Sequence, residues 1–527
     1  MYKDNQFYIA HGANGPIHML GDMANRHGFI GGATGTGKTV TLQVIAESFC
    51  QAGVPCFMAD MKGDLSGISQ PGKMSGFIEK RLPEFGLNAE QLQFAGCPVR
   101  FYDVFGEQGH PMRSTISEMG PELLARILEL NDTQTGVLNI VFRIADERNL
   151  LLDDVQDLRA MLDWVSKHAK EYTSTYGNIT TATVGAIQRS LLRLESQGGD
   201  KFFANPSFDV QDLLACEGGK GVMSVLAADK LMQQPILYST FLLWLLSELY
   251  STLPEVGDLE KPKLIFFFDE AHTMFENTSK ALTDKIEQVI RLIRSKGVGI
   301  FFITQLPTDV PDTILGQLGN RVQHALRAYT PRDQKAVRVA AETFRTNENF
   351  KTEEAITTLE TGEALVSFLD GKGAPGVVER AKVLFPLSQI GAITEGQRLD
   401  IVKQSAIYGK YDKVENRISA EEKIKQEMEQ AQAEAAEQEA ARQAEKEKAK
   451  QEKEDDKKKG IMSKVWKAIV TAVTATLGTL LGSFISGKVT GKKNKTSAKD
   501  AAGRVVKNAT SSATRTITRD ILGNILK

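Results

Sequence analysis

Eight consecutive residues near the N-terminus have the types and spacing of a phosphate-binding loop. They fit the pattern G-x-x-x-x-G-K-[ST] and are Gly32, Ala33, Thr34, Gly35, Thr36, Gly37, Lys38 and Thr39. Glycines let backbone N–H groups turn toward phosphate oxygens without Cβ clashes, and the helix that follows adds its positive N-terminal end. We expect these residues and Val40 to bind ATP, with Lys38 on the β- and γ-phosphates and the Thr39 hydroxyl on Mg²⁺.

A second set of chemical groups follows the very apolar run 264–268. This run ends in Asp269 and Glu270, which is the Walker B arrangement of a buried strand followed by two acids. Asp269 is expected to hold Mg²⁺, and Glu270 is expected to polarise the attacking water. His272 lies two residues further on, and either a packing role or a switch role is open for it.

Polar residues also follow two other expected strands. Gln305 comes after the apolar run 298–304, and ligands bind at the carboxyl ends of parallel strands. Gln305 is therefore expected to sense the γ-phosphate or orient water, with a plain strand-end role as the alternative. Asp60, Lys62 and Asp64 follow the strand expected at 54–59, where they either assist Mg²⁺, phosphate or DNA, or form a polar turn.

Strands and helices must alternate to place these groups at one edge. Continuous apolar runs indicate strands buried on both faces of a parallel sheet. The expected strands are 28–31, 54–59, 264–268, 298–304, 322–327 and 364–369. The expected helices are 38–51, 121–129, 150–168, 183–195, 235–250 and 283–295. The alternation predicts an α/β fold with helices on both faces of the sheet.

Composition and charge divide the 527 residues into unlike parts. The net charge of −2 is the sum of −10 for residues 1–416, −2 for 417–460 and +10 for 461–527. We expect the core to begin in residues 1–64, a mainly helical insertion at 65–260 and the rest of the core at 261–416. A charged helix or linker at 417–460 and a basic tail at 461–527 should follow.

The tail contains 18 residues without a charge, 468–485, which is at the lower limit for crossing a bilayer. Its Thr, Ala and Gly content makes insertion weak. One interpretation is that residues 461–490 associate with a membrane surface or with themselves. The other is a flexible or docking helix, followed by a basic, polar stretch at 488–499.

Four scattered cysteines with no C-x-x-C pair exclude a disulfide framework and most zinc sites. The N-terminal residues lack a basic segment followed by an apolar run, so no secretory signal is expected. Both features indicate a cytoplasmic location, with partial membrane association through the tail as an open addition.

The motifs together resemble the HerA/FtsK superfamily of DNA-pumping ATPases, and most closely its bacterial branch of HerA-like C-terminal-domain ATPases. The resemblance rests on the loop 32–39, Asp269–Glu270, Thr304–Gln305 and three further stretches, 57–66, 318–322 and 370–376. It covers about residues 5–400 and implies a RecA-like sheet, a ring of six subunits and double-stranded DNA in the central channel. It also implies an arginine reaching the neighbouring subunit's phosphate, for which the candidates are Arg321, Arg327 and Arg294, in that order.

Three functions from different classes follow from these features. The first is a magnesium-dependent, homohexameric ATPase that moves double-stranded DNA as a translocase or helicase-like motor. The second is a ring NTPase that remodels or exports protein at a membrane surface, favoured by the acidic body and the tail. The third is a nucleotide-gated scaffold, against which Glu270 counts because a scaffold needs no catalytic carboxylate.

Overall fold

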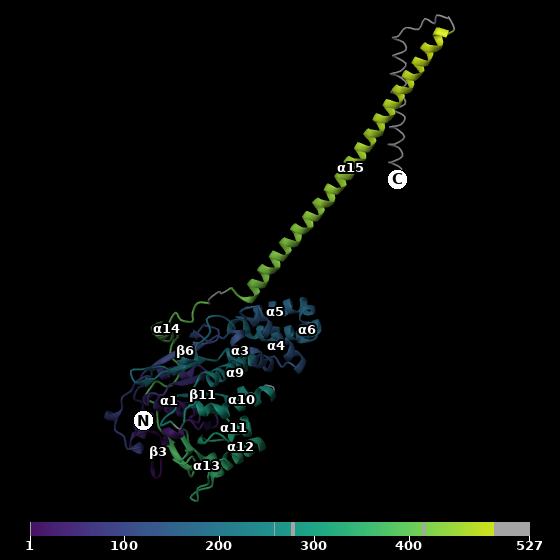
Figure 1. Cartoon of the computed structure of the whole chain (residues 1–527). Helices are drawn as coiled ribbons and strands as arrows, with labels where there is room; N and C mark the ends of the chain where they lie inside the picture. The colour runs from purple at the N-terminus through teal and green to yellow at the C-terminus, as the bar shows by residue number, and fades with distance from the viewer. Residues whose placement is uncertain (1, 258, 276–279, 415–417, 490–527) are drawn as a thin grey trace. The chain divides into compact units, whose positions relative to one another are not determined.

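A large, mostly parallel sheet organises the chain (Figure 1). The structure is a computed structural model that describes residues 2–257, 259–275, 280–414 and 418–489. Contacts divide the chain into two units, Met1–Lys425 and Gln426–Lys527, and each is described by itself. The sheet lies in the first unit.

Thirteen strands form this sheet within the described residues. Its antiparallel part contains β1 (Tyr2–Lys3), β2 (Gln6–Gly12), β3 (Gly15–Leu20), β14 (Glu363–Ser367) and β15 (Glu379–Val383). Its parallel part contains β4 (Gly28–Gly31), β5 (Cys56–Asp60), β6 (Val99–Asp103), β7 (His110–Pro111), β10 (Met223–Ala227), β11 (Leu264–Phe268), β12 (Val298–Thr304) and β13 (Asn320–Gln323). A separate hairpin pairs β8 (Cys216–Glu217) with β9 (Lys220–Gly221).

The strand order brings the chemical motifs to one edge of the sheet. The order in the parallel part is β13-β4-β12-β11-β5-β10-β6-β7. Thr304 at the end of β12 pairs with Gly31 at the end of β4, and Phe268 at the end of β11 pairs with Ala59 near the end of β5. Because these strands run in the same direction, the residues that follow them meet at the same edge.

Helices cover both faces of the sheet. They are α1 (Lys38–Gln51), α2 (Gly76–Arg81), α3 (Ile116–Ile127), α4 (Asp132–Glu147), α5 (Val155–Lys167), α6 (Ala169–Tyr176), α7 (Thr181–Leu194), α8 (Asp200–Phe202), α9 (Pro235–Thr252), α10 (Lys280–Ile293), α11 (Asp312–Leu315), α12 (Pro331–Glu342), α13 (Thr352–Thr358) and α14 (Glu395–Gln404). The last helix, α15 (Ala420–Val489), begins in the first unit and continues into the second.

Alternate side chains of β11 enter two different cores. Phe266 and Phe268 belong to the cluster that contains the side chains of α9. Ile265 and Phe267 belong to the cluster that contains α1. A strand buried on both faces has no polar side, which explains its unbroken apolar sequence.

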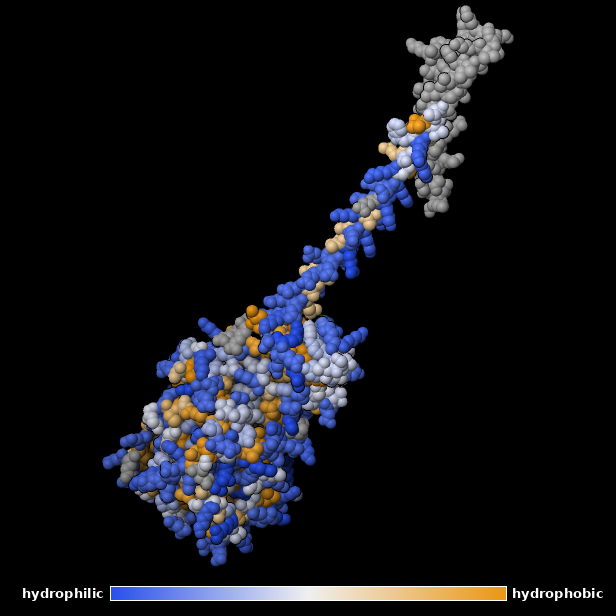
Figure 2. Space-filling view, viewed as in Figure 1, coloured by the Kyte–Doolittle hydropathy of each residue, from blue (hydrophilic) through white to orange (hydrophobic). Residues whose placement is uncertain are grey.

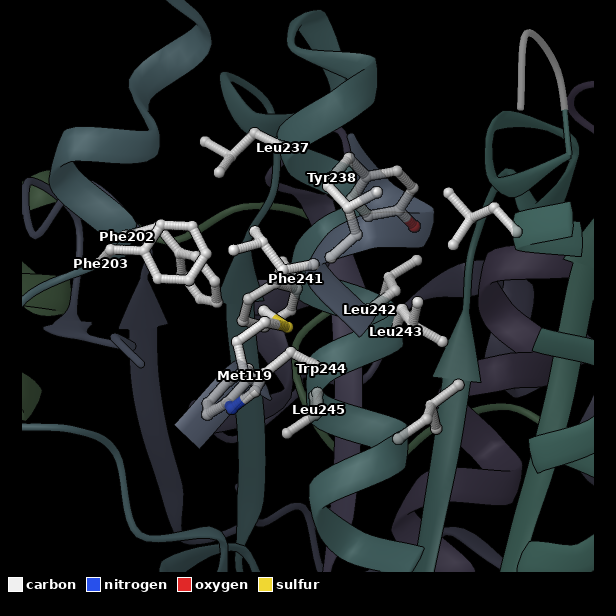
Figure 3. Close-up of a cluster of buried hydrophobic side chains, with 14 of the residues drawn as sticks. Met119, Phe202, Phe203, Leu237, Tyr238, Phe241, Leu242, Leu243, Trp244 and Leu245 are labelled. Atoms are coloured by element: carbon white, nitrogen blue, oxygen red, sulfur yellow. The ribbon is translucent and has the colours of Figure 1, made fainter. Parts of the chain in front are cut away.

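The larger core is centred on α9, which is apolar on all sides and almost completely buried. Figure 3 shows the aromatic side chains of this core, with Trp244 and Phe241 of α9 near Phe202 and Phe203. A helix with this composition must be covered by other elements, and α3 and α10 lie against it. The insertion is therefore packed onto the sheet and is not a separate lobe.

The expected α/β fold with helices on both faces of a P-loop sheet is confirmed. The helix at 38–51 and the strands at 264–268 and 298–304 have the expected bounds. The stretch 65–260 is mainly helical, yet it also supplies β6, β7 and β10 to the sheet, which periodicity alone did not reveal. The proposed domain boundaries stay a prediction.

Within the first unit, the start of α15 is anchored to α5. Ala420 and Ile424 are buried in the larger core. The backbone N–H of Glu421 donates to Asp157 Oδ1 at 2.9 Å. In the second unit the helix is exposed, and Figure 2 shows mostly hydrophilic side chains along it. The described helices include none that is long and apolar enough to cross a membrane, and the stretch from residue 490 lies outside the described residues.

Candidate nucleotide-binding site

The phosphate-binding loop joins β4 to α1. Gly37 caps α1 with a φ of 116°, and Gly32 has a φ of 150°, which side-chain-bearing residues rarely adopt. A Cβ at Gly32 would lie 2.5 Å from the Cβ of His324. Thr36 Oγ1 donates to the carbonyl of Ala33 at 2.7 Å and closes the turn. The backbone amides and the N-terminal end of α1 are therefore arranged as an anion cradle.

Neighbouring strands hold the loop in place. The N–H of Ala33 donates to the carbonyl of Ala325 at 2.8 Å, just beyond β13. The N–H of Gly362, just before β14, donates to the carbonyl of Thr36 at 3.0 Å. The loop is thus held at Ala33 and at Thr36 by the neighbouring strands. A loop that is already ordered loses less entropy when it binds a ligand.

Lys38 lies across the loop that it follows. Its Nζ donates to the carbonyls of Gly32 at 2.7 Å and Ala33 at 3.2 Å. Burial lowers the pKa of Lys38, and the nearby carboxylates of Glu270 and Asp269 partly offset this shift. The ammonium group therefore stands between the loop and the acidic end of β11, where it can neutralise phosphate charge.

The two acids after β11 differ in environment. Asp269 is buried, and burial together with the charge of Glu270 raises its pKa to about 6. Burial also acts on Glu270, but the hydrogen bond and charge of Lys62 hold the pKa of Glu270 below its usual value. Glu270 has a φ of 46°, a left-handed conformation that is uncommon for glutamate and points to a local constraint.

Lys62 comes to this site from the turn after β5. Its Nζ donates to Glu270 Oε1 at 2.5 Å, and this bond raises the pKa of Lys62. The other carboxylate oxygen of Glu270 is buried without a hydrogen-bond partner and lies 3.5 Å from His272 Nδ1. The structure places Lys62 against Glu270, a contact that was not among the roles expected from the sequence.

Asp60 and Asp64 place further negative charge beside Lys62. Asp60 Oδ1 accepts the N–H of Gly63 at 2.8 Å, which fixes the turn. Its Oδ2 and one carboxylate oxygen of Asp64 are buried and unpartnered. Burial and the charge of Asp64 raise the pKa of Asp60 to about 7.

We expect Asp60→Asn to raise the melting temperature, and to raise it more at pH 8 than at pH 5. The pKa of Asp60 is higher in the folded state than its ordinary value of 3.8, so its contribution to stability is complete below about pH 4. That contribution is lost as the pH rises through 7. Asparagine removes this loss and keeps the acceptor for Gly63. Thermal unfolding by circular dichroism from pH 5 to 8 measures the effect.

The exposed residue Asp163, which pairs with Lys167 on α5, supplies the matched control, Asp163→Asn. This variant should shift the melting temperature little and equally at both pH values. A destabilised Asp60→Asn protein, or a shift independent of pH, would contradict the burial argument.

Gln305 lies at the same edge as the phosphate loop, since the preceding residue pairs with Gly31. Its side chain is exposed. The preceding Thr304 donates its hydroxyl to Asp309 at 2.8 Å, and Asp309 also accepts the N–H of Leu306. The turn after β12 is thus stabilised without Gln305, whose amide stays a candidate sensor of the γ-phosphate.

The three arginine candidates differ in their surroundings. Arg321 donates from Nε, Nη1 and Nη2 to the carbonyls of Leu318, Thr343 and Leu315, at 2.8 to 2.9 Å. Burial lowers its pKa to about 10. These contacts use Arg321 inside its own subunit and favour a structural role. Arg327 is exposed, whereas Arg294 is half-buried near His27.

The donor set fits a nucleotide with Mg²⁺. Residues 32–39 provide backbone amides at the N-terminal end of α1 and one lysine, while Thr39 and Asp269 provide the oxygen ligands that Mg²⁺ prefers. No group of three or more His, Cys, Asp or Glu side chains in the described residues can hold a metal ion alone. Nucleotide phosphates and water must complete the coordination of the ion, as is usual for Mg²⁺.

Sequence reasoning did not identify His324, a buried residue that contacts both α1 and β14 next to the phosphate loop. Its Nε2 lies 2.7 Å from Thr41 Oγ1 in α1, and its Nδ1 lies 2.8 Å from the carbonyl of Glu363 in β14. Both contacts are long-range, so no local pattern marked this residue. It also missed Arg81, which donates to the carbonyls of Thr361, Gly362 and Val383 beside the loop.

Comparisons with known proteins agree with this geometry. A family model described as "Helicase HerA-like C-terminal" matches residues 6–527. The "DNA double-strand break repair helicase HerA" of Sulfolobus acidocaldarius is 21% identical over 365 residues, which cover 67% of this chain and 65% of that relative. The match thus spans less than two thirds of that relative's length.

Solved structures of related shape were also found. The bacterial conjugative coupling protein TrwB has a TM-score of 0.49 and 14% identity, covering 74% of this chain and 90% of its own. VirB4 of Thermoanaerobacter pseudethanolicus has a TM-score of 0.46 and 13% identity, covering 73% of this chain and 98% of its own.

Proposed function

Since the chain belongs to the helicase HerA-like C-terminal family, we propose that it is a magnesium-dependent, homohexameric ATPase that translocates double-stranded DNA. The observation that carries the ATPase proposal is the meeting of the phosphate loop and the acids of β11. The residues that follow β4, β11 and β12 meet at one edge of the sheet, and the charges of Glu270 and Asp269 act there on the pKa of Lys38. A phosphate-binding lysine and a candidate general base therefore share one site.

Each group has a distinct part in this proposal. The amides of residues 32–39 and Lys38 bind the phosphates, while Thr39 and Asp269 hold Mg²⁺, which neutralises charge on the phosphates. Glu270 accepts a proton from the attacking water, and its low pKa keeps it ionised at neutral pH. Gln305 positions this water or senses the γ-phosphate.

The proposal that DNA is the substrate rests on the family and on the name of the HerA relative. Residues 1–416 carry a net charge of −10, so their global field opposes DNA binding. A ring concentrates local basic groups in a channel, which lets an acidic subunit bind a polyanion.

The test is the ATP hydrolysis rate of the full chain with and without double-stranded DNA, at about 50 and 200 mM salt. We expect DNA to stimulate hydrolysis in wild type, more at low salt, and Lys38→Ala to abolish hydrolysis. Particle mass should correspond to six subunits. If a monomer hydrolyses ATP at the full rate and DNA does not change that rate, the DNA-motor proposal is rejected and only the ATPase proposal stands.

Arg327→Ala is expected to lower the hydrolysis rate about 100- to 1,000-fold while nucleotide binding and particle mass stay unchanged. Arg327 is exposed, and we propose that in a ring it acts on the phosphate bound by the neighbouring subunit. Mixing Arg327→Ala with Lys38→Ala subunits should restore part of the activity, because some interfaces then combine an intact loop with an intact arginine.

The adjacent exposed aromatic provides the control, Tyr329→Ala, which should retain full activity. If the mixture stays inactive although mixed rings form, Arg327 does not act across the interface, and Arg294 becomes the next candidate to test.

One observation favours the second candidate, a ring NTPase acting at a membrane surface. On α15, Met462, Trp466 and Val470 follow one another at a spacing of one helical turn and are exposed. By its spacing Lys464 falls on the opposite side of the helix, and Lys467 falls beside the apolar stripe. A helix with aromatic and basic faces binds anionic lipid surfaces.

Flotation with vesicles of anionic and of neutral lipid, using the full chain and a chain ending at Gly460, tests this candidate. Flotation of only the full chain, and only with anionic vesicles, supports it. Equal recovery of the two chains with both vesicles would reject it.

A further inference from the structure

A cavity of about 450 Å³ opens beside the phosphate loop, and most of its lining comes from residues outside that loop. Gly37 and Val40 line one side of it. Phe77 and Arg81 of α2 line another side, and the segment 383–390 forms the remaining wall. Its volume lies within the range of pockets that enclose small ligands.

The walls of this cavity are rigid. Glu47 of α1 accepts the backbone N–H groups of Leu387 and Ser388, at 2.8 and 2.9 Å. The hydroxyl of Ser388 also donates to Glu47. The N–H of Gly72 donates to the carbonyl of Leu387 at 2.9 Å, so the two outer segments are held together. A cavity with fixed walls is suited to a rigid, flat ligand.

The cavity also continues into the phosphate site. Arg81 donates to the carbonyls of Thr361 at 2.9 Å and Gly362 at 3.3 Å. The N–H of Gly362 in turn donates to Thr36 within the loop. A molecule whose phosphates lie in the loop therefore has its other end directed along Gly37 and Val40.

An aromatic ring stands at the mouth of the cavity. Phe77 is 50% exposed, which is high for a phenylalanine in a folded protein. The Arg81 guanidinium lies 4.6 Å from the centroid of its ring and can hold the ring in place. An exposed, oriented ring beside an apolar cavity is a stacking platform for a planar ligand.

Three polar side chains of the walls, those of Arg81, Ser388 and Gln389, are already bound within the protein. Arg81 donates to backbone carbonyls, and Ser388 bonds with Glu47. Gln389 donates to the carbonyl of Ala392 at 3.1 Å. These three side chains are therefore less available to read the hydrogen-bonding edge of a base, which is what separates adenine from guanine.

We infer that this cavity holds the purine base and ribose of the bound nucleotide by stacking on Phe77, with little discrimination between adenine and guanine. The inference rests on the proposed function, because it assumes that residues 32–39 bind the phosphates. Stacking favours the larger purine rings over pyrimidines, so CTP should bind more weakly than ATP and GTP.

Calorimetric titration of the full chain with ATP, GTP, CTP and inorganic tripolyphosphate, all with Mg²⁺, tests this inference. We expect the Kd values of ATP and GTP to agree within about fivefold and that of CTP to be at least about tenfold higher. Phe77→Ala should weaken ATP binding about 5- to 150-fold and tripolyphosphate binding less than about twofold.

Phe77→Trp keeps a stacking surface and should retain ATP affinity, while Tyr329→Ala removes an exposed aromatic elsewhere and should change nothing. If Phe77→Ala weakens ATP and tripolyphosphate equally, or neither, the cavity does not hold the base. A strong preference of wild type for ATP over GTP would also overturn the inference.

Failure of the proposed function gives a different pattern. If wild type and Lys38→Ala bind tripolyphosphate equally weakly, the phosphate loop itself is inactive and both proposals fall. If Lys38→Ala loses tripolyphosphate binding but Phe77→Ala has no effect on ATP, only the base site is rejected.

Discussion

Glu270→Gln is expected to lower the ATP hydrolysis rate about 100- to 10,000-fold while ATP affinity changes less than about twofold. Glu270 lies at the carboxyl end of β11, and Lys62 holds its pKa low, so it is an ionised base at neutral pH. One of its oxygens accepts from Lys62, and the other has no hydrogen-bond partner and is free to receive a proton. Glutamine keeps the shape but accepts no proton.

Single-turnover hydrolysis and calorimetric ATP binding, measured on the same preparations, separate chemistry from affinity. Glu255→Gln, at an exposed position, is the matched control and should retain the wild-type rate. Lys38→Ala should lose binding as well as hydrolysis. Equal slow rates for wild type and Glu270→Gln would indicate that no carboxylate assists the reaction, as expected of a nucleotide-gated scaffold.

The central strands and the phosphate loop were predictable because their signals are local. A strand buried on both faces needs an unbroken apolar run, as in β11 and β12, and the following turn must be polar. The loop 32–39 is defined by glycines, a lysine and a threonine at fixed spacing within eight residues. The rule that ligands bind where parallel strands end then places the polar residues that follow these strands at one edge of the sheet.

Other parts of the sheet have weak local signals. β2 and β3 precede the first apolar run noted in the sequence, and both mix buried with exposed or half-buried positions. β6 and β10 are separated by more than 100 residues of mostly helical chain, yet they are neighbours in the sheet. Pairing at such separations is decided by packing against α9 and other distant elements, which no short window contains.

Site residues divide in the same way. Asp269 and Glu270 are recognisable because they directly follow the unbroken apolar run of β11. The position of Lys62 is adjacent to a strand as well, but its bond to Glu270 crosses 208 residues and depends on β5 lying beside β11. The sequence places Arg321 after Asn320, beyond β12, which made it the first arginine candidate. Its bonds to three backbone carbonyls can be known only from the fold.

His324→Ala is expected to lower the free energy of unfolding by about 3–5 kcal/mol and to weaken ATP binding. His324 is fully buried below the loop. A carbonyl only accepts, so Nδ1–H donates to Glu363, and Nε2 then accepts the hydroxyl proton of Thr41. Alanine leaves a cavity and two unpaired polar groups. It keeps the Cβ that lies beside Gly32 but removes the imidazole ring, whose edge lies beside Gly37.

Two narrower variants divide this effect. His324→Asn can still donate to Glu363 from a group close to the position of Nδ1, whereas Thr41→Val removes only the hydroxyl. Each variant should lower the free energy of unfolding less than His324→Ala does. The double variant should lose less stability than the sum of the two single losses, because both changes remove the same His324–Thr41 hydrogen bond. Urea unfolding of the full chain measures all three, and His18→Ala, at a half-buried position, is the control.

The contribution of His324 to stability should also depend on pH. Burial lowers the pKa of His324 from 6.5 to about 4, so its neutral form contributes stability that is complete above pH 6.5 and is lost as the pH falls through 4. His27 is buried with a pKa of about 4 as well, and it bonds to Ile290 and Ile300. His324→Asn should therefore reduce, but not remove, the loss of stability between pH 6.5 and 4. An unchanged pH profile would mean that His324 is not held neutral under the loop, and the case for it as the loop's support would fail.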